Sequence, residues 1–380
     1  MLRPVSLVLL TVSLPASALG LYDDNINHLA LGGHAGLSIV QQGGDTAVVD
    51  SSSRMRFHFT RQLSQGWQTE ALMEWGFNLV DSGTDLLLNG DALQSQREGQ
   101  FLFNRLGFLA LQHDGWGRLS IGKQWSVYYD IAAFTDEFIT TGGLASGTYN
   151  FGTDGGLSGT GRADSAIQYR YDINNFHLGL QYQASAEGTV GFIPPEECEE
   201  ESPPEFCQQL EDFEISHDDS WGASVRYEFA GFTFGVGYNR GDFKSANLGS
   251  ARDEAIIYGI RYGRIFQPGL YVGANYADTE NHELDNQNRV FNGDGYELMV
   301  NWTFENGLTI VSGLNWLESD DPEYEAANGT FKRALYILGA HYRWGPLTKF
   351  YIEGKLDDSE FGVEQGSDDD VIGLGARFYF

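Results

Sequence analysis

Apolar and polar side chains alternate along most of this chain with a period of two residues. In the last ten residues, 371–380 (VIGLGARFYF), the even-numbered positions are all apolar and end on Phe378 and Phe380, and most positions between them are small or polar. This period is typical of a β-strand with one apolar and one polar face. Residues 54–59 (RMRFHF) repeat the pattern with basic side chains, which a soluble sandwich would bury only at a high cost.

The same alternation predicts an all-β chain of sixteen strands. They are expected at residues 29–39, 53–63, 67–80, 100–113, 117–125, 162–172, 176–183, 221–229, 232–240, 255–265, 270–278, 295–304, 308–316, 335–344, 349–357 and 371–380. Short, breaker-rich turns such as 114–116, 230–231 and 345–347 alternate with long polar connections. This rhythm is typical of a transmembrane antiparallel β-barrel, in which apolar faces meet lipid and polar faces line the lumen. An even number of strands closes such a barrel without an open edge.

Residues 1–20 are expected to be a secretory signal peptide, leaving 21–380 as the barrel. Arg3 supplies a basic start, residues 5–14 an apolar core, and residues 16–18 (ASA) a small-residue cleavage site. The cut follows either Ala18 or Gly20. The apolar core is too short to cross about 30 Å of hydrocarbon as a helix. No later segment offers a long apolar run either, and the mean hydropathy is −0.30, so a helical membrane protein is not expected. A soluble secreted protein is compatible with that value, so the periodicity decides for the barrel.

The charge balance is strongly acidic, with 53 acidic and 23 basic residues and a formal net charge of −30. Nucleic acid is therefore not an expected partner. The carboxylates gather between the periodic segments, at residues 196–201, 211–219, 318–325 and 357–370. Two interpretations are open: a solvated loop surface suited to a saline environment, or a negative vestibule that enriches cations or sugars and repels anions.

Two cysteines, Cys198 and Cys207, lie in one Pro- and Glu-rich connection at about residues 184–219. In an oxidising compartment two loop thiols this close in sequence are expected to form a disulfide. A bond closing so small a loop contributes about 2.5–3 kcal/mol in the chain-entropy model. No histidine or further cysteine lies between them, so a metal site is not expected.

The connection at about residues 126–161 differs from the other long ones. It contains eight glycines and few charges, although an external loop of this acidic chain would be expected to carry more carboxylates. A segment rich in glycine and aromatic residues is more easily accommodated folded inward against a barrel wall. We therefore expect this third long connection to fold into the lumen.

Several runs in and around this connection are distinctive: NRLGF (104–108), GRLSIGKQWSVYYD (117–130), FTDEF (134–138) and GRADSAIQYR (161–170). In these runs residues 101–182 resemble the trimeric general-diffusion porins of Gram-negative bacteria, and the similarity extends weakly to both termini. The resemblance implies a homotrimer in the outer membrane, in contact with lipids and lipopolysaccharide. The terminal Phe380 implies recognition by the outer-membrane barrel assembly machinery.

In those porins carboxylates on the third loop face a ladder of arginines across the narrowest point of the channel. Carried over position by position, the pore constriction would consist of His34, Arg56, Arg105, Arg162, Asp136 and Glu137. Residues 138–141 (FITT) replace the family's Pro-Glu-Phe after the loop aspartate, which weakens the assignment of Glu137. The alternative interpretation is that the arginines only line water and that Glu137 bonds to the wall.

The function expected from these features is a water-filled channel for passive diffusion of ions and small hydrophilic solutes. One alternative is a substrate-selective oligosaccharide channel similar to chitoporins, and another is a surface barrel whose channel is closed. An enzyme is not expected, because neither a G-x-S-x-G nor an H-E-x-x-H motif is present. No cofactor is expected either.

Overall fold

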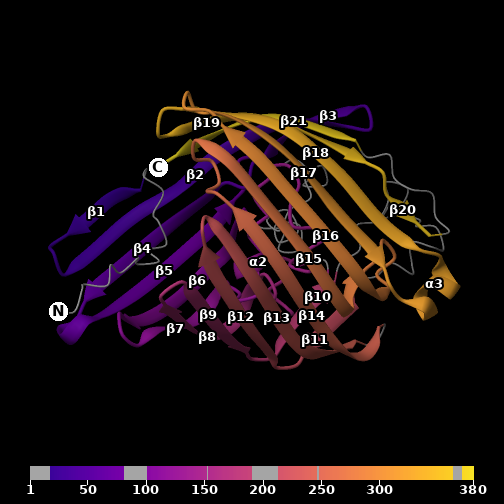
Figure 1. The fold of residues 1–380 in the computed structure, drawn as a ribbon, viewed down its shortest axis with the longest axis horizontal. Helices are drawn as coiled ribbons and strands as arrows, with labels where there is room; N and C mark the ends of the chain where they lie inside the picture. Colours follow the sequence, from indigo (N-terminus) through magenta and orange to yellow (C-terminus); the bar gives the residue numbers. More distant parts are fainter. Residues whose placement is uncertain (1–17, 81–100, 152, 191–212, 246–247, 363–369) are drawn as a thin grey trace.

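In the computed structural model the chain forms one antiparallel β-barrel (Figure 1). The structure describes residues 18–80, 101–151, 153–190, 213–245, 248–362 and 370–380. Cys198 and Cys207 lie outside the described residues, so their disulfide stays a prediction. Residues 1–17, the greater part of the expected signal peptide, also lie outside them.

Sixteen strands form the barrel wall. In chain order they are β2 (Asn27–Gln42), β4 (Arg54–Gln62), β5 (Trp67–Phe77), β6 (Leu102–His113), β7 (Gly117–Trp125), β8 (Arg162–Ile173), β9 (Phe176–Gln183), β12 (Ser220–Phe229), β13 (Phe232–Ser245), β14 (Gly249–Tyr262), β15 (Gly269–Leu284), β16 (Val290–Thr303), β17 (Leu308–Ser319), β18 (Phe331–Trp344), β19 (Thr348–Asp357) and β21 (Val371–Tyr379). Each pairs antiparallel with its neighbours along this order. The predicted sixteen-stranded antiparallel barrel is confirmed.

In the described residues, five further short strands adjoin this wall. They are β1 (Leu19–Asp23), β3 (Asp45–Asp50), β10 (Ala186–Val190), β11 (Phe213–His217) and β20 (Glu360–Phe361). β3 continues the line of β4 along β2, and β10 and β11 pair with each other beyond β9 and β12. Their composition is mixed: β3 begins and ends with aspartate, whereas β1 carries the exposed side chains of Leu19 and Leu21.

The barrel closes where β21 pairs with β19 on one side and with β2 on the other. β21 covers the second half of β2 and β1 covers the first half, so the two lie end to end along the same neighbour. At their junction the Gly33 amide donates to the Phe380 carbonyl at 2.9 Å, and the Phe380 amide donates back at 3.1 Å. Leu19 and Gly20, which the sequence assigned to the signal region, are the first residues of β1.

The two faces of the wall differ as the alternation predicts. Outward-facing apolar side chains such as Leu338, Leu180 and Phe378 are exposed, whereas inward-facing polar ones such as Gln168 and Glu70 are buried. Among the residues that the structure describes, the helical elements are a 3-10 turn, η1 (Ser64–Gly66), and two short helices, α2 (Tyr129–Ala132) and α3 (Pro322–Asn328). Within the described part of the chain, no helix is long and apolar enough to cross a membrane.

Candidate functional site: the inner loop and the facing wall

Residues 126–161, which we call the inner loop, join β7 to β8 and lie against the inside of the wall. The loop begins with α2, which contacts β12, β13 and β14. Ile131 and Phe134 pack with Ala255, Ile257 and Ala277, all buried and all on the inward face of β14 and β15. An apolar core therefore lies inside the barrel, between loop and wall, while the outer face of the same strands is apolar for lipid.

The wall accommodates the inner loop through inward-facing glycines on consecutive strands. A Cβ at Gly273 would lie 2.0 Å from the Phe134 carbonyl oxygen, and one at Gly295 would lie 1.7 Å from the Ala145 carbonyl oxygen. At Gly313 it would lie 2.3 Å from the Phe138 ring. Such distances are far below van der Waals contact, so the loop backbone approaches this wall only because these positions carry no side chain.

Buried carboxylates on the wall hold the loop backbone. Glu353 in β19 accepts hydrogen bonds from the backbone amides of Ile139 and Thr140, each at 2.8 Å. Glu297 in β16 accepts from the Ala145 amide at 2.9 Å and from the Thr135 hydroxyl. These contacts satisfy loop amides that burial would otherwise leave without partners. They also use acidic side chains for positioning rather than for facing solute.

The wall formed by β4 to β8 carries the predicted arginines. Arg105 Nε donates to Glu74 Oε1 at 2.9 Å, and Arg56 Nη1 lies 3.8 Å from Glu74 Oε2. Arg162 Nη1 lies 3.4 Å from Asp154 Oδ2 on the inner loop. Two carboxylates therefore offset part of the positive charge of this wall.

The Arg162 guanidinium also lies 5.2 Å from the centre of the Trp125 ring, at cation–π distance. The Trp125 ring in turn stacks on Tyr129, with ring centres 3.8 Å apart. This contact ties the end of β7 to the first residues of the inner loop and to the start of β8. It fixes the direction in which the loop leaves the wall.

His34 lies on the inward face of β2, opposite Arg54 of the neighbouring strand β4. The side chain is buried, with Nε2 at 3.4 Å from the Ser51 carbonyl oxygen and the ring 5.3 Å from that of Tyr379. The charges of Arg54, Arg377 and Arg105 reach it. It therefore belongs to the same electrostatic region as the arginines but packs below the lumen surface.

The two loop carboxylates occupy different environments. Asp136 is half-buried and accepts hydrogen bonds from the Tyr129 hydroxyl at 2.9 Å and the Tyr149 hydroxyl at 2.6 Å. The charges of Arg162 and Arg54 reach its carboxylate. Tyrosine hydroxyls fix the direction of Asp136, so it can present a stationary negative charge to the basic wall.

Glu137 is exposed, and the charges of Lys349, Arg54 and Arg377 reach it. Sequence reasoning did not single out Arg54, Lys349 and Arg377, nor the carboxylate Glu74. The alternation could have indicated that these four side chains point into the barrel, because each occupies an inward position of its strand. Alternation alone, however, does not give depth along the barrel, which decides whether an inward charge faces the inner loop.

The comparisons with known proteins agree with this architecture. The family model described as Gram-negative porin matches residues 6–362. This chain belongs to the Gram-negative porins. Outer membrane porin N of Escherichia coli (strain K12) is 24% identical to this porin over 394 residues, covering 96% of this chain and 95% of the relative.

Two solved structures are similar to the porin. "Salmonella typhi OmpF complex with Daunomycin" gives a TM-score of 0.71 at 18% identity and covers 95% of this chain and 100% of that chain. "OmpT (in-vitro folded), an outer membrane protein Vibrio cholerae (trimer form)" gives 0.60 at 16% identity, with coverage of 94% and 100%. These likenesses concern the fold.

The protein is therefore an outer-membrane porin, a channel-forming protein. The named relatives favour a general channel over the oligosaccharide-selective alternative. Among the described residues no group of three or more His, Cys, Asp or Glu side chains is arranged to hold a metal ion.

Proposed function

We propose that the porin is a general-diffusion channel whose narrowest part lies between the inner loop and the wall formed by β4 to β8. The observation that carries this proposal is that opposite charges lie near each other: the negative Asp136 on the loop is within electrostatic reach of the positive Arg54 and Arg162 on the wall. Fixed charges that face each other across water set a local potential and so select ions. His34, Arg56, Arg105 and Glu137 complete the proposed constriction.

The ion selectivity of this constriction is expected to be weak. Glu74 bonds to Arg105 and lies near Arg56, and Asp154 lies near Arg162, so the wall is less positive than its arginines alone would make it. Charges in water are screened over roughly 8–10 Å at physiological ionic strength. Selectivity should therefore depend on these few side chains, and less on the many external carboxylates.

We also propose that the porin assembles as a homotrimer. The exposed apolar outer face of the barrel would meet lipid over part of its circumference and neighbouring subunits over the rest. The Vibrio cholerae protein with the similar fold is described in a trimer form. Contacts with lipopolysaccharide, and recognition of Phe380 by the barrel assembly machinery, belong to the same proposal.

Signal cleavage after Ala18 fits the proposed mature chain better than cleavage after Gly20. Leu19 pairs with Leu31 and Gly20 with Ala30 in β1, so a cut after Ala18 keeps this strand whole. A cut after Gly20 would remove two of its pairs. N-terminal sequencing of the protein extracted from outer membranes distinguishes the two positions.

Recording in planar lipid bilayers tests the channel proposal. The purified porin should insert with ohmic current steps in groups of three, and small sugars should not block the current at micromolar concentration. Insertion without current would refute an open channel. Strong block by one class of oligosaccharide would favour selective uptake over general diffusion. A small reversal potential in a salt gradient would support a constriction in which carboxylates partly offset the arginines.

A further inference from the structure

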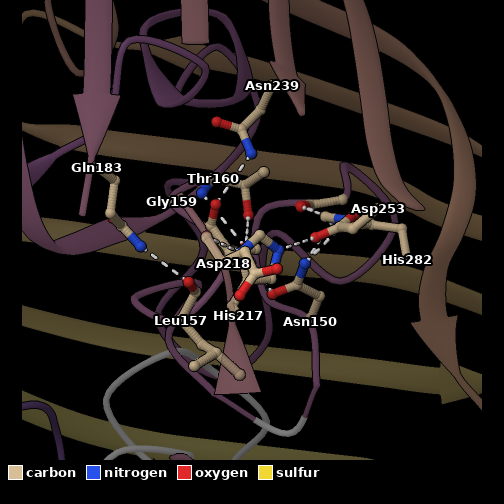
Figure 2. Close-up of polar contacts among 12 residues, drawn as sticks. Asn150, Leu157, Gly159, Thr160, Gln183, His217, Asp218, Asn239, Asp253 and His282 are labelled. Carbon is tan, nitrogen blue, oxygen red and sulfur yellow. Dashed lines mark hydrogen bonds and ion pairs between the residues drawn. The ribbon is translucent and has the colours of Figure 1, made fainter. Parts of the chain in front are cut away.

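A buried cluster of His217, Asp253 and His282 connects the wall to the inner loop (Figure 2). These residues come from β11, β14 and β15, and each is no more than 1% exposed. We call them the His–Asp cluster. Three ionisable side chains are costly to bury unless their hydrogen bonds and charges are satisfied. The donors and acceptors around these side chains therefore indicate which of their ring nitrogens carry a proton.

Asp253 lies between the two imidazole rings. Its Oδ2 is 2.8 Å from His217 Nε2, and its Oδ1 bonds to His282 Nδ1. The second nitrogen of each ring faces a backbone carbonyl: His217 Nδ1 is 3.0 Å from the Asp218 oxygen, and His282 Nε2 is 2.7 Å from the Gly147 oxygen. Each nitrogen of both rings thus faces an oxygen acceptor, and the His282 ring also faces the amide nitrogen of Asn150, which is a donor.

A neutral imidazole carries one N–H and one lone pair, whereas an imidazolium carries two N–H donors. Carbonyl and carboxylate oxygens only accept. A neutral His282 bonded to Asp253 would turn its remaining lone pair toward the Gly147 oxygen at 2.7 Å. Double protonation of His282 removes this repulsion.

The surrounding groups balance these charges. The Glu283 carboxylate, also buried, acts electrostatically on both His282 and Asp253, and Arg333 acts on Glu283. The cluster and its nearest charged neighbour thus bring two imidazole rings together with two carboxyl groups. The Asn150 amide nitrogen lies 2.8 Å from His282 Nε2 and 3.0 Å from Nδ1.

The other ionisable groups near the cluster have partners of their own. Tyr128 on the inner loop donates its hydroxyl to the Ser146 carbonyl at 2.7 Å, one residue before Gly147. The Asp218 carboxylate is half-buried and accepts from Lys244 Nζ at 2.5 Å.

Other contacts of the inner loop do not depend on protonation. Asn239 Nδ2 donates to the Ser158 carbonyl at 3.0 Å, and Gln183 Nε2 donates to the Leu157 carbonyl at 2.8 Å. Amide side chains do not titrate, so this later part of the loop stays attached at any pH at which the barrel is folded. The contact between His282 and Gly147 is different, because it requires a proton on Nε2 while Nδ1 donates to Asp253.

We propose that the His–Asp cluster is a proton-dependent latch that positions the middle of the inner loop. With His282 charged, its Nε2–H holds the Gly147 carbonyl against the wall. Loss of that proton replaces a hydrogen bond by lone-pair repulsion, and the loop around Gly147 and Asn150 moves away from β15. This proposal rests on the assignment of the inner loop as the constriction, since only then does its movement change the current.

Two substitutions at one position separate the two bonds of His282. In His282→Asn the side-chain amide can still meet Asp253 but does not reach Gly147, and in His282→Gln it can reach Gly147 but loses Asp253. Neither amide titrates. His58→Gln is the matched control: His58 Nε2 is also bonded to a carboxylate, Glu70 at 2.9 Å, but its buried Nδ1 meets no hydrogen-bond acceptor and it does not contact the loop.

The test combines single-channel recording at about pH 6.5 and about pH 9.5 with nitrogen NMR of ¹⁵N-histidine-labelled porin in detergent. For the parent we expect current fluctuations to become about tenfold more frequent at the higher pH, as for the loss of one charged hydrogen bond. His58→Gln should keep this pH profile, and both His282 variants should lose it. A His282 variant with the parental profile would overturn the latch.

The NMR signals keep the latch separate from the channel proposal. At about pH 6.5 they should show two N–H groups on the His282 ring, and a neutral ring there would overturn the latch even if the porin conducts as proposed. If the porin does not conduct at all, the channel proposal fails. The protonation of His282 then still decides whether the loop is held by a charged donor.

Discussion

Glu353 in β19 joins the barrel wall to Thr140 of the inner loop: its carboxylate accepts hydrogen bonds from both the backbone amide and the hydroxyl of Thr140. Glu353 Oε2 accepts from the Thr140 amide at 2.8 Å and from its hydroxyl at 2.9 Å. The other oxygen, Oε1, lies 2.6 Å from His341 Nε2. One side chain thus orders the loop directly after Asp136 and Glu137, and so sets where those two charges stand.

Replacing Glu353 by Ala should loosen the inner loop. The buried amides of Ile139 and Thr140 would lose their acceptor, at about 1–3 kcal/mol for each unsatisfied group. We expect noisier single-channel currents and dissociation of folded porin in SDS at a lower temperature. Glu353→Gln is the matched control, because its side-chain oxygen can still accept from the loop. Equal behaviour of the parent and Glu353→Ala would show that this joint does not position the loop.

Adding one methyl group to the wall should displace the loop. In Gly295→Ala the new Cβ would fall 1.7 Å from the Ala145 carbonyl oxygen, so the loop must move or the strand must shift. Overpacking of this kind typically costs about 1–3 kcal/mol. We expect an altered single-channel conductance. Gly354→Ala is the control, since its nearest neighbour is a carbonyl oxygen 3.7 Å away. An unchanged conductance in Gly295→Ala would argue against the close approach.

Charge substitutions at the proposed constriction should shift selectivity in opposite directions. Asp136→Asn removes a negative charge and should move the reversal potential toward anions. Arg105→Ser removes a positive one, and should move it toward cations and widen the pore. Reversal potentials in a salt gradient measure both. Parental selectivity in both variants would place the constriction elsewhere.

Glu74 provides an independent test of the balanced wall. Its carboxylate offsets Arg105 and Arg56, so Glu74→Gln should make the wall more positive and increase the preference for anions. The substitution keeps the size of the side chain, which separates charge from packing. A shift toward cations would contradict the assignment of this wall to the channel lining.

The predicted disulfide is tested without any substitution of the wall. Mass spectrometry of the unreduced protein should find Cys198 bonded to Cys207, and free thiols on both would contradict the prediction. Replacing both by Ser should leave the conductance nearly unchanged, because this loop is expected to lie outside the membrane, distant from the constriction.

The strands were predictable from the sequence where they cross the membrane, and less so beyond it. The predicted strand at 255–265 overlaps β14, but β14 begins at Gly249, six residues earlier. Its first residues are polar and lack the alternation, yet they pair with the end of β13, where Lys244 lies opposite Ser250. Hydrogen bonding to a neighbouring strand extends β-structure into water without any requirement on the side chains.

The same limit applies to the site. Alternation placed Arg56 and Arg162 on the inward face, and the motif resemblance located Asp136, but neither indicated that Glu74 would lie against Arg105. That contact depends on register between β5 and β6, where a shift falls between Glu74 and Trp75. Register is set by pairing along the whole strand, and one sequence does not display it locally.

By itself, the sequence determined which residues face lipid, which face the lumen, and that sixteen strands close into a barrel, because a period-two pattern and alternating loop lengths are local properties of the chain. Only the tertiary structure decided how the inner loop is held. Its partners, Glu297, Glu353 and the His–Asp cluster, lie more than fifty residues from it in sequence. Such contacts arise when the barrel closes and brings distant strands around the loop.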